Sequence, residues 1–192
     1  MLQHKGTVTL ETHRLILRRF TLEDAEDMFS NWANDSEVTK YLTWWPHDSI
    51  DTTREVLSIW INEYSNNTAY NWAIELKETG QIIGSISVVD LCSKDCRCEI
   101  GYCISKVYWN KGITTEALKE VIGFLFSQVG INRIQAKHDV LNIGSGKVMQ
   151  KAGMKYEGTF RQFYVRKDGS FGDVNMYAAL QEDYTLDKLE RK

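Results

Sequence analysis

Three runs with strand character follow one another closely in the middle of the chain, and they constrain the fold more than any other feature. They cover residues 71–76, 82–91 and 96–105, and they are rich in apolar and β-branched residues. Glu78-Thr79-Gly80, between the first two runs, is typical of a hairpin turn. The pattern therefore predicts an antiparallel meander of three strands.

Helical patterns flank this meander on both sides. A threonine followed by acidic residues predicts a helix over residues 21–33, and a serine in the same role predicts a second helix over residues 49–64. The expected apolar stripe of the second helix consists of Ile50, Val56, Leu57, Ile59 and Trp60. After the meander, apolar residues at helical spacing predict a core helix over residues 114–127, with Gly130 as its stop.

The remaining segments complete an alternation of strands and helices. Residues 13–20 and 133–140 have strand patterns, residues 143–151 predict a short helix closed by Gly153, and two last strands surround Lys167-Asp168-Gly169. A meander followed by alternating strands and helices predicts an α+β fold, with a mixed, largely antiparallel central sheet flanked by helices. The 192 residues, 43% of them hydrophobic and 26% charged, fit a single domain over residues 1–192.

Charge and hydropathy argue against several classes of protein. The formal net charge is -3, so no basic field covers the chain, and we expect no nucleic-acid partner. No apolar run approaches the ~20 residues of a membrane span, and the first ten residues lack the apolar segment of a signal peptide. We therefore expect a cytoplasmic protein with no membrane partner.

The four cysteines do not predict a metal site. Their spacing is C-x3-C-x-C-x4-C, whereas zinc sites usually have paired C-x2-C arms. We expect reduced, structural thiols in a cytoplasmic protein, and no metal. The cysteines are Cys92, Cys96, Cys98 and Cys103.

A Gly-Ser-Gly-Lys sequence at residues 144–147 is similar to part of the phosphate loop of nucleotide hydrolases. That loop also needs a glycine five residues before Gly146 and a hydroxyl after the lysine. Leu141 and Val148 stand at those two positions. The tight turn and the metal-binding oxygen are both lost, so the sequence argues against a nucleotide hydrolase.

The segment from Glu99 to Ala117 carries the most chemical information. It is a strand, then a short loop that contains Gly112, then a helix. The free N–H groups and the dipole of a helix start bind anions, and Lys111 adds a positive charge beside them. Gly112 lets the backbone come close to a phosphate, although a glycine before a helix is also common in simple turns.

Residues 109–117, WNKGITTEA, resemble the acetyl-CoA pyrophosphate loop of the GNAT superfamily of N-acetyltransferases. They are most similar to its RimJ/RimL-like branch, the ribosomal-protein N-acetyltransferases, in which W-G-x-G-[IY]-A-T-E-A is usual. Further matches occur in the same order along residues 11–180: THRLILRRF, EIGYCI, NRIQA, Asn142-x-x-Ser145 and KAGMKYEG. The resemblance implies a GNAT-type acyl-CoA N-acyltransferase fold, with acetyl-CoA as co-substrate.

The resemblance also implies a set of residues that bind acetyl-CoA. Asn110 replaces the usual first glycine of the loop and Thr114 the usual alanine or glycine, but Asn tolerates positive φ and a Thr hydroxyl can donate to phosphate. Asn142 and Ser145 would lie beside the pantetheine arm and the sulfur, which accounts for the Gly-Ser-Gly-Lys sequence, although Asn142 also suits a helix cap alone. The implied set is Cys103, Ile104, Trp109, Asn110, Lys111, Gly112, Ile113, Thr114, Thr115, Asn142 and Ser145.

Family resemblance further implies that a primary amine attacks the thioester directly in a ternary complex. Glu99 is the candidate base, acting through water, with Glu157 and Asp173 as lesser alternatives, and a solvated or salt-bridged role for Glu99 is the competing interpretation. A backbone N–H near Cys103 and Ile104 would stabilise the oxyanion. Ser145 would give the departing thiolate a proton or a hydrogen bond, and Asn142 would position the pantetheine. A covalent route through the Cys103 thiol is the alternative.

The acceptor remains open at the level of the sequence. Trp44 and Trp45 lie between the first two helices, where the family builds its acceptor wall; either they line an acceptor pocket or one of them caps the core. The acceptor is a protein N-terminal amine or a small-molecule amine. A non-catalytic CoA-binding sensor and a partner-binding module with an empty cleft are the other functions considered. A homodimer is consistent with the branch.

Overall fold

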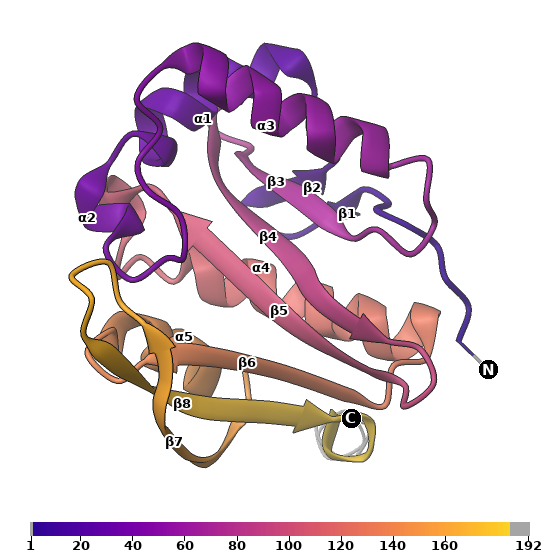
Figure 1. The fold of residues 1–192 in the computed structure, drawn as a ribbon. Coiled ribbons are helices and arrows are strands. Elements are labelled where there is room, and N and C mark those ends of the chain that lie inside the picture. Colours follow the sequence, from indigo (N-terminus) through magenta and orange to yellow (C-terminus); the bar gives the residue numbers. More distant parts are fainter. Residues whose placement is uncertain (1, 185–192) are drawn as a thin grey trace. The chain divides into compact units, whose positions relative to one another are not determined.

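A computed structural model of the chain describes residues 2–184 and has an α+β fold. Eight strands form a sheet in the order β1-β2-β3-β4-β5-β6-β8-β7 (Figure 1). The contacts divide the chain into two compact units. The N-terminal unit consists of residues 4–87 and 102–117, and the C-terminal unit contains residues 88–101 and the described residues from 118 onward. The prediction of a single domain stays a prediction.

The strands of the N-terminal unit are antiparallel, as the meander pattern predicts. β2 pairs with β1 and β3, and β3 pairs with β4. Gly80 forms the turn between β3 and β4 at φ +69°, and its N–H donates to the carbonyl of Leu76 (2.8 Å). The strands are β1 (Leu10–Glu11), β2 (Leu15–Arg18), β3 (Asn71–Leu76), β4 (Ile82–Cys92) and β5 (Arg97–Ile104), and the last two continue into the C-terminal unit.

The first predicted helix is present but irregular. A 3-10 turn (Leu22–Asp24), α1 (Ala25–Met28) and a π-helical turn (Phe29–Ala33) follow one another. The N–H of Thr21 donates to the Asp24 carboxylate (2.8 Å), which fixes the helix start. The structure adds the short α2 (Ser36–Thr39), which the sequence analysis did not predict.

The second predicted helix is α3 (Ile50–Glu63), and its predicted cap is confirmed. The Ser49 hydroxyl accepts a hydrogen bond from the N–H of Thr52 (3.2 Å). Leu57 is fully buried, but Ile59 is 59% exposed, so its assignment to the apolar stripe was wrong. Ile59 lies two positions from Leu57, and residues two apart on a helix do not share a face.

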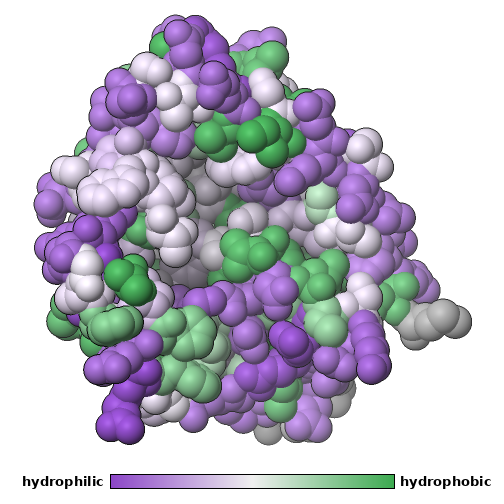
Figure 2. Space-filling model, in the orientation of Figure 1, coloured by the Kyte–Doolittle hydropathy of each residue, from purple (hydrophilic) through white to green (hydrophobic). Residues whose placement is uncertain are grey.

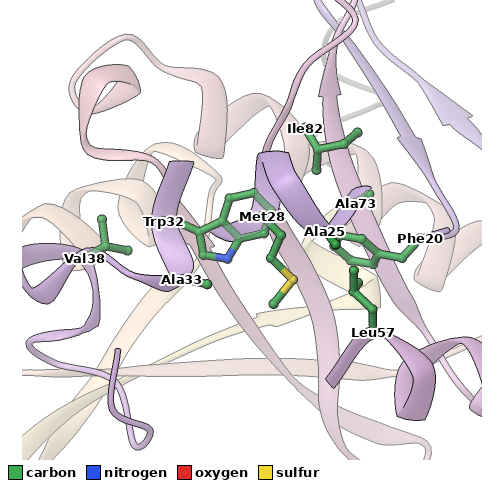
Figure 3. Close-up of a cluster of buried hydrophobic side chains, with 9 residues drawn as sticks. All are labelled: Phe20, Ala25, Met28, Trp32, Ala33, Val38, Leu57, Ala73 and Ile82. Carbon is green, nitrogen blue, oxygen red and sulfur yellow. The ribbon is translucent and has the colours of Figure 1, made fainter. Parts of the chain in front are cut away.

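A hydrophobic cluster holds these helices against the strands of the N-terminal unit (Figure 3). Trp32 and Met28 come from the first helical segment, Leu57 from α3, and Ala73 and Ile82 from β3 and β4. Burial of these side chains is the main favourable term in packing the helices on the sheet. The complete cluster is Phe20, Ala25, Met28, Trp32, Ala33, Val38, Leu57, Ala73 and Ile82.

The C-terminal unit contains the mixed part of the sheet. β6 is parallel to β5 over Arg97–Glu99 and antiparallel to β8 along its whole length, and β8 is antiparallel to β7. The pairing of β5 with β6 ends at Glu99 and Gln135, so the next residues of β6 pair with β8 alone. The strands are β6 (Arg133–Asp139), β7 (Lys155–Val165) and β8 (Phe171–Leu180).

The two helices that follow the meander match their predicted ranges closely. α4 (Ile113–Phe124) continues into a π-helical turn and stops at Gly130, which has φ +85°. α5 (Ile143–Lys151) stops before Gly153, at φ +90°. Both glycines adopt the left-handed conformation that ends helices. The apolar residues predicted for the core helix are all buried: Ala117, Leu118, Val121, Ile122, Leu125 and Phe126.

On the face shown in Figure 2, hydrophobic residues form small groups among hydrophilic ones. Among residues 2–184, no helix combines the length and the apolar composition that crossing a bilayer requires.

Candidate functional site

The loop before α4 contains two residues in the left-handed backbone conformation, as its asparagine and glycine suggest. Asn110 has φ +61° and Gly112 has φ +75°, so both residues adopt the left-handed conformation. Asparagine accepts this conformation more readily than other non-glycine residues, which explains how Asn110 replaces a glycine here. The Trp109 indole donates to the carbonyl of Ile104 (3.1 Å) and closes the loop onto the end of β5.

The first turn of α4 offers backbone donors. The first intrahelical hydrogen bond runs from the N–H of Glu116 to the carbonyl of Gly112 (3.0 Å), so the N–H groups of residues 113–115 precede this ladder. Ile113 and Thr114 are 3% and 8% exposed, which anchors the turn in the N-terminal unit. The Lys111 ammonium lies over the Tyr108 ring, 5.3 Å from its centroid. Backbone N–H groups with a lysine beside them suit the phosphate oxygens of coenzyme A.

Asn142 and Ser145 lie together at the start of α5. The Asn142 Oδ1 accepts a hydrogen bond from the N–H of Ser145 (3.2 Å), so Asn142 caps the helix as its structural interpretation predicts. Both side chains are half-buried. A cap uses only the oxygen of the carboxamide, so a ligand role for its NH2 group is compatible with capping.

A buried carboxylate, which the sequence analysis missed, supports this helix start. Asp139 ends β6, and its side chain is fully buried. It accepts hydrogen bonds from the N–H of Leu141 (2.7 Å), from Arg166 Nε (2.7 Å) and from the Tyr164 hydroxyl. An aspartate at the end of a buried strand was the one sequence feature that could have pointed to this cluster. Its partners, Tyr164 and Arg166, lie 25 and 27 residues later in the sequence, so the cluster itself was not predictable.

Opposing effects act on the ionisation of this cluster. Burial alone would raise the pKa of Asp139, but the hydrogen bonds from Arg166, Tyr164 and Leu141 outweigh it and lower the pKa. Burial and the neighbouring Asp139 raise the pKa of Tyr164 to about 12. The ionised carboxylate of Asp139 therefore links β7 to the segment that leads into α5.

Glu99 takes part in an ion pair, as its competing interpretation predicts. Its Oε1 pairs with the Lys137 ammonium and its Oε2 accepts from Gln135 Nε2 (3.1 Å). The residue is 9% exposed, and it lies where the pairing of β5 with β6 ends. The Lys137 ammonium also lies over the ring of Phe163, at 5.5 Å. An ion-paired carboxylate keeps unused lone pairs, so this geometry is compatible with a base as well.

The two lesser base candidates have structural partners. Arg133 donates from both terminal nitrogens to Glu157, and these hydrogen bonds lower the pKa of Glu157. Asp173 accepts a hydrogen bond from the N–H of Gln162 (2.7 Å), which holds the last hairpin. These contacts favour structural roles for both carboxylates.

Cys103 is a half-buried thiol on β5. Its sulfur is 3.3 Å from the Ser85 hydroxyl, and burial raises the pKa of the thiol. A raised thiol pKa lowers the fraction of the nucleophilic thiolate. Beside it, β4 approaches so closely that a Cβ at Gly84 would lie 2.4 Å from the carbonyl oxygen of Cys103.

The two tryptophans of the acceptor hypothesis have different environments. Trp44 packs against the hydrophobic cluster, and the centroid of its ring lies 5.4 Å from that of His47. Trp45 is 66% exposed. One tryptophan therefore covers the core, and the other presents a large apolar surface.

The predicted site residues belong to both units. Trp44, Trp45, Cys103, Ile104 and the loop over residues 109–115 lie in the N-terminal unit. Glu99, Asn142 and Ser145 lie in the C-terminal unit. Trp109 contacts Ile104 within the N-terminal unit, and Ser145 contacts Asn142 within the C-terminal unit. The assembly of both groups into one catalytic site stays a prediction.

No cluster of metal-ligating side chains appears in the described part of the chain. Within residues 2–184, His, Cys, Asp and Glu side chains do not gather in groups of three or more that could hold a metal ion. The four thiols are unpaired cysteines. The expectation that the protein needs no metal stays a prediction.

The chain is similar to known acetyltransferases over most of its length. It is 35% identical over 172 residues to the uncharacterized N-acetyltransferase YoaA of Bacillus subtilis strain 168, a match that covers 90% of this chain and 96% of the relative. It is 30% identical over 142 residues to YdaF of the same organism, named as a candidate ribosomal N-acetyltransferase, covering 73% and 75% of the two chains.

A solved structure and a family model agree with these relatives. The crystal structure of a GNAT-family acetyltransferase from Bacillus anthracis superposes with a TM-score of 0.80, at 27% identity, over 91% of this chain and 99% of that one. The model of the acetyltransferase (GNAT) domain matches residues 14–155. Membership of this family implies acetyl-CoA as the acyl donor. The chain therefore belongs to the GNAT family of N-acetyltransferases, in its RimJ/RimL-like branch.

Proposed function

We propose that this N-acetyltransferase transfers the acetyl group of acetyl-CoA to a primary amine, by direct attack in a ternary complex. The observation that carries the proposal is the loop at Asn110 and Gly112, where two residues at positive φ precede the start of α4. A left-handed turn followed by free helical N–H groups is a phosphate-binding geometry. When bound, acetyl-CoA supplies the reactive thioester.

Asn142 and Ser145 act on the thioester end of the donor in this proposal. The Asn142 oxygen is used by the cap, which orients the carboxamide so that its NH2 group donates to a pantetheine carbonyl. The Ser145 hydroxyl donates a proton to the sulfur as the C–S bond breaks, and the ammonium proton of the tetrahedral intermediate restores the hydroxyl. The cap that joins these two residues holds both groups on the same helical turn.

Glu99 removes the proton from the attacking amine, through a water molecule, in this proposal. Its carboxylate is fixed by Lys137 and Gln135 at the point where β5 leaves β6. Glu157 is a weaker candidate because the hydrogen bonds from Arg133 lower its pKa, which makes it a poorer base, and Asp173 because it holds the last hairpin through the N–H of Gln162. A backbone N–H of Cys103 or Ile104 would stabilise the oxyanion.

The state of Cys103 favours direct transfer over a covalent intermediate. Burial raises the pKa of this thiol, and its partner is the hydroxyl of Ser85, which is not a base at neutral pH. Direct attack predicts sequential kinetics. Ping-pong kinetics would instead indicate an acetylated enzyme.

A protein N-terminal amine is the acceptor class to test first. YdaF, the relative named above, is described as ribosomal, which supports a protein acceptor in this branch. Trp45 offers an exposed aromatic surface of the kind that binds apolar peptide side chains, while Trp44 is occupied by core packing.

The test compares acceptors by amine-dependent release of CoA thiol. Peptides with a free N-terminus are assayed beside the same peptides with a blocked N-terminus, and beside polyamines, amino sugars and amino acids. Release that requires the free peptide N-terminus supports a protein acceptor. Release with small amines alone assigns a small-molecule acceptor, and the absence of release with every amine contradicts the proposal.

A further inference from the structure

Two residues between β1 and β2, Thr12 and Arg14, contact the first turn of α4, which lies about a hundred positions later in the sequence. The Glu116 carboxylate accepts hydrogen bonds at Oε1 from the Thr12 hydroxyl (2.6 Å) and the Arg14 backbone N–H (2.9 Å). Its Oε2 accepts from Arg14 Nε (2.7 Å). Both carboxylate oxygens are therefore bound by one short segment of chain.

The same arginine also binds the loop itself. Arg14 Nη1 donates to the carbonyl oxygen of Lys111 (3.0 Å), so one planar guanidinium joins Lys111 to Glu116. Its Nη2 would lie 3.6 Å from a Cβ at Gly112, so the guanidinium also flanks that residue. We call Arg14 and Glu116 the loop clasp.

The geometry of the peptide bond shows what the clasp does to the loop. The chain contains no cis peptide bond among the described residues, so the carbonyl of Lys111 and the N–H of Gly112 point in opposite directions. Because Arg14 holds that carbonyl, the N–H of Gly112 is directed away from the guanidinium. The clasp thus selects one orientation for a backbone donor in the loop.

Burial and charge make the clasp stronger than an exposed ion pair. The Glu116 side chain is 20% exposed and that of Arg14 39%. Partial burial alone would raise the pKa of Glu116, but the hydrogen bonds from Thr12 and Arg14 outweigh it and lower the pKa. Arginine fits this role because its rigid, planar group donates to two acceptors at once.

We propose that Arg14 and Glu116 are positioning residues for acetyl-CoA, because they hold the left-handed turn at Asn110 and Gly112 in the conformation that receives the phosphates. This inference rests on the proposed function and deepens it. The clasp acts on the donor side alone, so it changes the affinity for acetyl-CoA and leaves the chemical step and the acceptor unaffected.

The test measures the Kd of acetyl-CoA by calorimetry, both KM values, kcat and the melting temperature. Arg14→Gln and Arg14→Lys both weaken acetyl-CoA binding by about tenfold, the cost of ordering a loop during binding. We expect Arg14→Lys to weaken acetyl-CoA binding as much as Arg14→Gln does, because a single ammonium cannot replace two directed N–H donors. Glu116→Gln has the same effect, and Thr12→Val, which removes one hydroxyl, has a smaller effect in the same direction.

Arg54→Gln is the matched control. Arg54 forms an ion pair with Asp51 on α3 (2.8 Å), is half-exposed, and loses the same charge on substitution. We expect it to leave the Kd of acetyl-CoA, kcat and both KM values unchanged. Thr12→Val keeps every charge, so it tests the clasp even if an Arg14 variant fails to fold.

Three outcomes would overturn the inference. Normal affinity in Arg14→Lys with a loss in Arg14→Gln would assign the effect to charge alone. Lower melting temperatures with unchanged acetyl-CoA affinity in all clasp variants would assign the pair to stability alone. If the unmodified protein binds no acetyl-CoA, both the proposed function and this inference fail. If the unmodified protein and every clasp variant bind acetyl-CoA with the same affinity, only this inference fails.

Discussion

The imidazole of His138 occupies the space that a side chain at position 146 would need. A Cβ at Gly146 would lie 2.6 Å from Nε2 of His138, and this buried nitrogen has no hydrogen-bond partner within residues 2–184. Nδ1 is 2.7 Å from the carbonyl oxygen of Asp139, which can only accept, so Nδ1 carries a proton and donates this hydrogen bond. Gly146 therefore lets α5 pack directly on β6.

This contact predicts different effects for the same substitution at two positions of one helix. Gly146→Ala lowers the free energy of unfolding by about 1–3 kcal/mol, because the added methyl group overpacks against His138. Gly144→Ala is the matched control, since its Cβ would have only the Asn142 side chain nearby, at 3.7 Å. Urea denaturation measures both variants, and equal stabilities would show that His138 does not restrict position 146.

The Asp139 cluster predicts a pH-dependent contribution to stability. The pKa of Asp139 is lower in the folded state than in the unfolded chain, so its contribution is present above the unfolded value and is lost as pH falls through the folded one, below about pH 4. Asp139→Asn lowers the free energy of unfolding at pH 7 by about 2 kcal/mol.

Asp139→Asn also makes the loss of stability in acid less steep. The exposed Asp51, 78% accessible, is the control, because Asp51→Asn leaves both the stability at pH 7 and its acid dependence near the wild-type values. Denaturant titrations from about pH 2 to about pH 7, which cross the ordinary pKa of an aspartate near 3.9, measure both. An acid dependence that is unchanged in Asp139→Asn would contradict the prediction.

Gly84 predicts a steric limit beside Cys103. A Cβ at this position would lie 2.4 Å from the Cys103 carbonyl oxygen and 2.9 Å from the Ile104 Cα. Since both are backbone atoms, Gly84→Ala must displace β5, and we expect it to destabilise the protein by about 3 kcal/mol, the upper end for overpacking. Ser85→Ala, which removes only the hydroxyl beside Cys103, is expected to cost about 1 kcal/mol. Thermal unfolding that ranks the two variants in the reverse order would contradict this account.

Glu99 gives a kinetic prediction. Glu99→Gln lowers kcat/KM by roughly 100-fold, the low end for the loss of a general base, and changes the pH–rate profile. Glu157→Gln is expected to retain activity, because Arg133 binds both oxygens of Glu157 and lowers its pKa. A pH–rate profile that is unchanged in Glu99→Gln would exclude Glu99 as the base.

Local features of the fold were predictable because their causes are local. Ser49 caps α3 through a residue three positions later, and Gly130 and Gly153 end helices through their own φ angles. The start of α5 at Asn142 follows the same rule. Such interactions involve neighbours in sequence, so residue type and spacing are sufficient to predict them.

The missed features depend on residues that are distant in sequence. Nothing near Arg14 indicates that it will bind Glu116, 102 positions later, and Asp139 binds Arg166, which lies 27 positions later, beyond α5 and β7. α2 was missed for another reason: it has four residues, too few for a periodic pattern, although Asp35 caps it. Pairings of this kind follow from strand topology, which the sequence pattern does not specify.

Calorimetric titration with acetyl-CoA tests the central claim most directly, using the unmodified protein and Gly112→Ala. Gly112 has φ +75°, and an alanine there costs about 1–2 kcal/mol of backbone strain, so the variant distorts the loop without changing its charge. We predict saturable binding by the unmodified protein and binding weaker by about tenfold in the variant. The absence of binding by the unmodified protein, or equal binding by both, would contradict the assignment of this loop as the acetyl-CoA site.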